Sequence, residues 1–158
     1  MSSKANVAAV KAGLNKAFAM TDCGEVHNFL GIRITRDCGH KTIMLDQEHF
    51  IHQVLNQFRM LECKTVTTPL EPSFHSKKEG ENSERVNKRV YRQIIGNLMY
   101  VMTGMHPDIA AAISTLSQFA ENPTQMHQSA VLRVLRYLKG TCNYRLCLGG
   151  ESGDNNSK

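Results

Sequence analysis

The sequence lacks several features that would assign it to a membrane or secreted class of protein. No apolar run approaches the roughly 20 residues that a membrane-spanning helix needs, so no membrane partner is expected. The start of the chain has no long apolar stretch, and no secretory signal is expected either. The five cysteines are odd in number and scattered, which argues against a disulfide framework. These features indicate an intracellular location, cytoplasmic or nuclear.

The common signatures of catalytic and metal sites are also missing. No phosphate loop of the form G-x-x-x-x-G-K-[ST] occurs, and no serine–histidine–acid or cysteine–histidine arrangement stands out. Cys142 and Cys147 lack Cys-x-x-Cys spacing and are interpreted as residues of a final strand. His49 and His52 share one helix face, but without a third ligand a solvated face is favoured over zinc. We expect no catalytic residue, no metal and no cofactor in this chain.

The chain contains enough apolar residues to form a modest hydrophobic core. It also carries an excess of positive charge. It has 158 residues, 41% of them hydrophobic, and a formal net charge of +5. The charged residues between Arg85 and Met105 are all basic, and so are those between Gln125 and Cys147. Two interpretations stay open for these stretches, namely ordinary solvated helix faces and a surface that faces phosphate.

Periodicity and turn residues predict an α+β fold. The first half is predicted to hold a helix over residues 3–18 with Ser3 as its cap, a strand over 26–35, a hairpin loop at 37–40, a returning strand over 42–45 and a helix that Asp46 caps. The second half is predicted to hold three helices and a strand. The helices run from Arg85 or Val90 to Met102, from about Pro107 to Phe119, and from Thr124 to Lys139, and the strand covers residues 143–148.

Four segments resemble one protein family in the order that the family has them. They are residues 18–25 (FAMTDCGE), 29–34 (FLGIRI), 45–51 (LDQEHFI) and 91–100 (YRQIIGNLMY), and the last is followed by Pro107-Asp108-Ile109 and by RYLKGT at 136–141. Together they resemble the copia-type retrotransposon reverse transcriptase, part of a Pol polyprotein, over nearly the whole chain. The chain departs from the family pattern at His106, where the family has arginine, and at Cys23, where it has leucine.

The resemblance implies RNA-directed DNA synthesis for the full-length family enzyme, with two magnesium ions held by a Y-x-D-D hairpin and an earlier aspartate. This chain has no adjacent pair of aspartates. In the family that hairpin lies upstream of the first matching segment, and ribonuclease H follows the last. We therefore expect a piece that comprises the late palm, the thumb and the connection, that is not an enzyme on its own, and for which magnesium belongs only to the full-length protein.

The expected domain organisation follows from the resemblance. Residues 1–70 would form a late-palm or primer-grip hairpin with a thumb-like helix, 71–86 a polar linker, 87–148 a mainly helical connection-like unit and 149–158 a disordered tail. The two structured parts are not expected to pack tightly, and a lone hairpin without sheet neighbours would be marginal in water.

Two groups of residues are candidates for binding nucleic acid. The segment that resembles a primer grip contributes Phe29, Leu30, Gly31 and Arg33, and the thumb-like helix contributes Gln47. The missing side chain of Gly31 permits close backbone approach, although an ordinary half-buried hairpin with a glycine bulge is the favoured interpretation.

The second group lies on the last predicted helix. Ala130, Val131, Val134, Leu135 and Leu138 form an apolar stripe, and Arg133, Arg136 and Lys139 project from the other side. These cations suit a nucleic-acid backbone or, alternatively, plain solubility. His127 falls on the apolar side and is predicted to be a packed histidine.

Two hypotheses about function result. The first is a reverse transcriptase fragment that grips an RNA–DNA hybrid or another nucleic acid but does not polymerise. The second is a host-adopted module that binds a protein partner or associates with itself through exposed apolar faces, without a nucleic-acid function.

Overall fold

Four helices surround one hydrophobic core in the computed structural model, which describes residues 4–72, 74 and 86–149. They are α2 (Glu48–Gln57), α3 (Lys88–Gly104), α4 (Ala110–Ser117) and α5 (Gln125–Thr141), with the short 3-10 helix η1 (Pro107–Ile109) before α4. The apolar stripe predicted for the last helix, Ala130, Val131, Val134, Leu135 and Leu138, is buried in this core. The core comprises Ile51, Val54, Leu55, Tyr91, Ile94, Ile95, Leu98, Val101, Ile109, Ala112, Ile113, Leu116, Ala130, Val131, Val134, Leu135 and Leu138.

The expectation that the two parts of the chain do not pack tightly is wrong. Helix α2 contributes Ile51, Val54 and Leu55 to the same core as α3, α4 and α5, and it lies against α5. The reason is the apolar arc of α2, which can be buried only against another apolar face. The domain boundaries at 70 and 86 stay a prediction, and most of the expected linker and all but the first residue of the expected tail lie outside the described residues.

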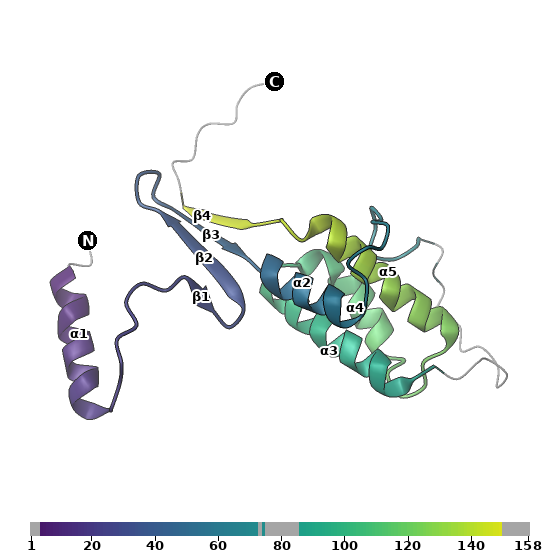
Figure 1. Cartoon of the computed structure of the whole chain (residues 1–158), viewed down its shortest axis with the longest axis horizontal. Coiled ribbons are helices and arrows are strands. Elements are labelled where there is room, and N and C mark those ends of the chain that lie inside the picture. Colours follow the sequence, from purple (N-terminus) through teal and green to yellow (C-terminus); the bar gives the residue numbers. More distant parts are fainter. Residues whose placement is uncertain (1–3, 73, 75–85, 150–158) are drawn as a thin grey trace, which may run out of the picture.

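A four-stranded antiparallel sheet projects from this helical body (Figure 1), in the order β1 (Asn28–Phe29), β2 (Ile32–Asp37), β3 (Thr42–Asp46) and β4 (Leu146–Gly149). The predicted α+β class is confirmed, and the predicted final strand exists as β4, paired with β3. The hairpin is therefore not alone, because β1 and β4 extend it on both sides. At the β2–β3 turn the Asp37 carboxylate accepts hydrogen bonds from the backbone of Gly39 and His40.

The single strand expected over residues 26–35 is wrong, because the chain reverses inside it. Asn28 pairs with Arg33 and Phe29 with Ile32, so Leu30 and Gly31 form a two-residue turn between β1 and β2. Both turn residues have positive φ, at 50° and 78°, as a type I′ hairpin turn requires. Leucine is rarely found at positive φ, so this turn could not be predicted from the sequence pattern.

The helix ends differ in detail from the sequence expectations. Asn87 caps α3 by accepting from the backbone of Arg89 and Val90. Asp46, expected to cap α2, instead ends β3, and Gln47 occupies the cap position without a side-chain bond. The Asp46 carboxylate still accepts a hydrogen bond from the backbone of Glu48, the first residue of α2, at 3.4 Å, but Arg33 donates to both of its oxygens at shorter distances.

Helix α1 (Lys4–Ala17) stands apart from the rest of the molecule (Figure 1). Every described side chain from Asn6 to Gly31 is exposed, including the apolar positions that predicted this helix. The predicted cap Ser3 lies outside the described residues.

Two histidines of the helical body, His106 and His127, are buried, whereas His49 and His52 on α2 are exposed. His127 was predicted to be a packed histidine and is 1% exposed, with its ring stacked on Phe119 and its Nδ1 accepting from the backbone of Thr124 at 3.0 Å. His106 is equally buried in the turn after α3, with Nδ1 3.3 Å from a carboxylate oxygen of Asp108. The second Asp108 oxygen accepts from the Tyr137 hydroxyl at 2.6 Å, which ties this turn to α5.

Candidate nucleic-acid interface

The candidate residues form two separate groups in the structure. Phe29, Leu30, Gly31, Arg33 and Gln47 gather where the sheet meets the start of α2. The cations of the second group lie along α5, in the helical body (Figure 1). The structure does not bring the two groups together.

The β1–β2 turn is an exposed apolar tip supported from behind. Phe29 is 60% exposed and Leu30 is 72% exposed. Behind them, a Cβ on Gly31 would lie 3.3 Å from the Tyr100 hydroxyl, and the Tyr100 ring packs edge-on against Phe50 with centroids 4.7 Å apart. Glycine is required here both for its positive φ and for this close approach, so the expected close approach occurs, but to α3 of the same chain.

Arg33 is engaged in holding the sheet to α2. Its Nε donates to both oxygens of Asp46 at 3.0–3.1 Å, and its Nη2 donates to Glu48 at 2.5 Å. These hydrogen bonds, chiefly those that Arg33 donates to Asp46, raise the pKa of Arg33 above its ordinary value. Arg145 approaches the same Asp46 carboxylate at 3.7 Å. A phosphate at Arg33 would have to compete with two carboxylates.

Gln47 lies inside the protein and fits against Gly104. It is 1% exposed, and a Cβ on Gly104 would lie 2.4 Å from its Nε2. Neither its Nε2 nor its Oε1 has a hydrogen-bond partner among the described residues. The buried Gln47 side chain thus holds the start of α2 against the end of α3.

The α5 cations hold a segment of the chain that crosses above them, residues 63–71, here called the strap. Arg133 donates to Glu71 and to the Thr68 hydroxyl, both at 3.0 Å. Arg136 donates through Nε to the Lys64 carbonyl at 2.7 Å, and Lys139 donates to the Cys63 carbonyl at 2.8 Å. No local sequence pattern predicts this arrangement, because more than 60 residues separate the partners along the chain.

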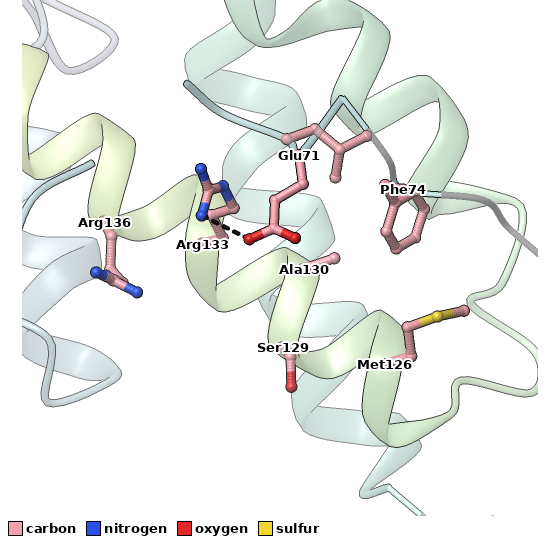
Figure 2. Close-up of a pocket in the computed structure, with 8 residues that line it drawn as sticks. Glu71, Phe74, Met126, Ser129, Ala130, Arg133 and Arg136 are labelled. Carbon is pink, nitrogen blue, oxygen red and sulfur yellow. Dashed lines mark hydrogen bonds and ion pairs between the residues drawn. The ribbon is translucent and has the colours of Figure 1, made fainter. Parts of the chain in front are cut away.

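Beside the strap a groove runs along the first half of α5. Figure 2 shows Arg133 directed at Glu71, while the Arg136 guanidinium points away from that ion pair. The groove has a volume of about 440 Å³, and its lining combines a cationic end with an apolar end. The lining residues are Leu70, Glu71, Phe74, Met126, Ser129, Ala130, Arg133 and Arg136.

A second basic cluster lies at the start of α3 and was noted in the sequence only as a charge excess. Lys88, Arg89 and Arg92 line a shallow depression there. Lys88 and Arg92 both pair with Glu121, and Arg92 also donates to the Ala120 carbonyl at 3.0 Å. Two of these three cations are therefore paired within the chain.

The donor set does not fit the pair of magnesium ions that the family enzyme uses. In the described ranges no three His, Cys, Asp or Glu side chains are grouped so as to hold a metal ion. The carboxylates of Asp46 and Glu48 come together, but they do so around the guanidinium of Arg33.

A helix that spans a membrane must be both long and apolar. No helix in the described part of the chain is long and apolar enough to cross a membrane.

Comparison with known proteins identifies the family. Residues 1–72 match the family described as reverse transcriptase (RNA-dependent DNA polymerase). The chain is 38% identical, over 93% of its length, to the retrovirus-related Pol polyprotein from transposon TNT 1-94 of Nicotiana tabacum, of which it covers 11%. It is 36% identical over 85% of its length to the Pol polyprotein from transposon RE1 of Arabidopsis thaliana, of which it covers 9%.

A shorter relative matches as well. An uncharacterised mitochondrial protein of Arabidopsis thaliana is 37% identical over 81% of this chain, and the chain covers 51% of it. The chain thus spans about a tenth of the length of the polyproteins and about half that of the mitochondrial protein. No solved structure matches it. The family match and these relatives show that the chain belongs to the reverse transcriptases of copia-type retrotransposon Pol polyproteins and corresponds to a segment of them.

Proposed function

We propose that this chain holds a nucleic-acid strand without extending it, and that the groove beside the strap makes the contact. The observation that carries the proposal is the lining of the groove, where Arg133 and Arg136 follow one another along α5 beside Phe74 and Met126. Cations that track a backbone next to apolar side chains on which bases rest are the usual elements of single-strand binding.

Arg136 is the residue best placed to bind phosphate. It uses Nε for the strap, and in the described part of the chain its two terminal nitrogens make no hydrogen bond. A guanidinium fixed at one nitrogen keeps a planar pair of donors for a phosphate. Arg133 is less available, because Glu71 and Thr68 occupy both of its terminal nitrogens.

The test is binding of a labelled RNA–DNA hybrid and of the corresponding single strands in a filter assay at several salt concentrations. We expect Arg136→Ala to weaken binding about tenfold, the scale of a charged hydrogen bond, and to lower the salt slope by about 1. Arg89→Ala is the matched control, since Arg89 is an exposed arginine of α3 outside the groove. An equal loss of nucleic-acid affinity in the two variants would contradict a specific contact in the groove and would indicate diffuse attraction to a basic surface instead.

The same proposal includes the absence of polymerase activity from this chain alone. Two-metal phosphoryl transfer needs carboxylates free to bind the ions. Asp46 and Glu48, which share one guanidinium, already neutralise Arg33. A location inside the cell, cytoplasmic or nuclear, accords with five cysteines that are all free thiols in the structure.

The alternative function, a module that binds a protein or itself, is favoured by a different observation. Large apolar side chains are exposed on α1 and on the sheet, away from the groove. This apolar surface shares no residue with the groove, so the two functions do not exclude each other.

A further inference from the structure

One face of the sheet is apolar from edge to edge. Opposed residues of paired strands lie on the same face, and alternate residues of a strand lie on opposite faces. The register therefore places on one side a set of residues that we call the apolar sheet face: Phe29, Ile32, Ile34, Ile43, Leu45, Leu146 and Leu148. Arg36 is the one charged side chain that the register places among them. None of these residues belongs to the helical core.

A second apolar surface lies on α1. Val7, Val10, Leu14 and Phe18 recur at helical spacing and are between 41% and 64% exposed. A helix of 14 residues is marginal in water without a packing partner. The helix therefore lacks the contact that would stabilise it.

The segment after α1 supports it as a separate arm, defined here as residues 4–24. Lys11 donates to both oxygens of Asp22, at 2.8 and 3.0 Å, and Asp22 accepts from the backbone of Gly24. Leu14, Met20 and Cys23 line a small hollow between the helix and this returning segment. The arm thus has internal contacts of its own and stands off the sheet of its own chain (Figure 1).

We propose that the apolar sheet face binds the arm of a second copy of this chain, in a reciprocal two-fold dimer. Each copy carries one arm and one apolar sheet face. An exchange between two copies therefore buries both surfaces of each copy and leaves none free to bind a third copy. Eleven of the twelve most exposed large apolar side chains in the described ranges belong to the arm or to the sheet with its adjoining residues, and the twelfth is Met99. Eight of them belong to the arm or to the apolar sheet face, the two surfaces that the exchange would cover.

The available area is sufficient for a stable dimer. A large apolar side chain that is half exposed presents on the order of 100 Å². The eight such side chains on the arm and the apolar sheet face offer each copy on the order of 800 Å², the same order as the roughly 800 Å² per partner in a standard interface. The exchange does not involve the α5 groove, and its failure would leave the proposed function untouched.

Light scattering after size exclusion, over a wide range of protein concentration, tests the dimer. We expect the unaltered chain to dimerise as its concentration rises. Val10→Glu in the arm and Leu146→Glu on the sheet should each raise the dissociation constant about tenfold or more, because a buried charge opposes the contact. Met99→Glu is the control, because Met99 is also an exposed apolar residue but lies on α3 outside both surfaces, and it should leave the dimer intact.

Mixing the two disrupted variants distinguishes an exchange from other modes of association. The Leu146→Glu copy keeps a sound arm and the Val10→Glu copy keeps a sound sheet, so the mixture should regain a heterodimer through one arm–sheet contact. Circular dichroism verifies that the helical core of each variant is folded. A monomer at every concentration, a dimer that both variants retain, or a mixture that stays monomeric would overturn the proposal.

Discussion

At the scale of single residues, Gly104 shows how one missing side chain positions two elements. The buried amide of Gln47 occupies the space that a Cβ on Gly104 would need. Gly96 lies in the same helix and has no atom within 4 Å of its ideal Cβ. A side chain added at Gly104 would therefore clash with Gln47, whereas one added at Gly96 would meet no other atom.

We expect Gly104→Ala to lower the free energy of unfolding by about 1–3 kcal/mol, the usual cost of overpacking. Gly96→Ala should instead raise it by about 0.5–1 kcal/mol through helix propensity. Urea denaturation measures both. Combining Gly104→Ala with Gln47→Ala should restore most of the loss, and an additive double variant would exclude the steric explanation.

The buried His106 makes stability depend on pH. Burial lowers its pKa below the ordinary value of 6.5, although the nearby Asp108 opposes this shift. The unfolded chain therefore takes up this proton at a higher pH than the folded chain does. Stability contributed by neutral His106 is present above pH 6.5 and is lost as pH falls through and below that value.

We accordingly expect the free energy of unfolding to fall between pH 7 and pH 5, by at most about 1.4 kcal/mol per pH unit from this one group. Replacing His106 by Asn should flatten this dependence relative to the unaltered chain. Denaturation at a series of pH values provides the comparison. An identical slope in the variant would assign the pH dependence to other groups.

At the scale of elements, the β1–β2 turn is the clearest departure from what the sequence predicts. Leu30 has φ of 50° in a turn that favours asparagine or glycine, and its side chain is exposed. A leucine there costs backbone energy without contributing to the core. Such a residue is typical of a contact surface rather than of a turn selected for stability.

We therefore expect Leu30→Asn to stabilise the β1–β2 hairpin by about 1 kcal/mol, since asparagine tolerates positive φ. Amide hydrogen exchange of the paired residues of β1 and β2 would report slower exchange. Faster exchange would mean that the Leu30 side chain stabilises the turn in a way that its exposure does not reveal.

The elements that sequence reasoning placed correctly share a cause. The buried faces of α2, α4 and α5 repeat at helical spacing, and a local pattern suffices to find them. Long-range contacts leave no such pattern. Nothing near Arg133 in the sequence indicates Glu71, and nothing near Gly104 indicates Gln47. The candidate cations were thus found, but the strap that holds them was not.

At the scale of the whole molecule, an ion pair within the chain occupies part of the groove that we propose for nucleic acid. Glu71 occupies one terminal nitrogen of Arg133 on the wall where a phosphate would bind. The carboxylate is 60% exposed, so its ion pair with Arg133 is weak enough for an anion to displace.

We expect Glu71→Gln to strengthen binding of a nucleic-acid strand by up to about fivefold, because an exposed ion pair is worth roughly 0–1 kcal/mol. Glu62→Gln is the matched control, an exposed acid outside the groove. Fluorescence anisotropy of a labelled strand measures both variants. Weaker binding by Glu71→Gln would show that an intact strap matters more than a free Arg133.

The most direct measurement follows an end-labelled primer annealed to an RNA template in the presence of the pure chain, magnesium and deoxynucleotides. We expect the protein to retain the labelled hybrid at low salt, to release it as the salt concentration rises, and to leave the primer at its original length. A primer that is lengthened, with the extension abolished by a chelator, would contradict the account, and so would a hybrid that is never retained.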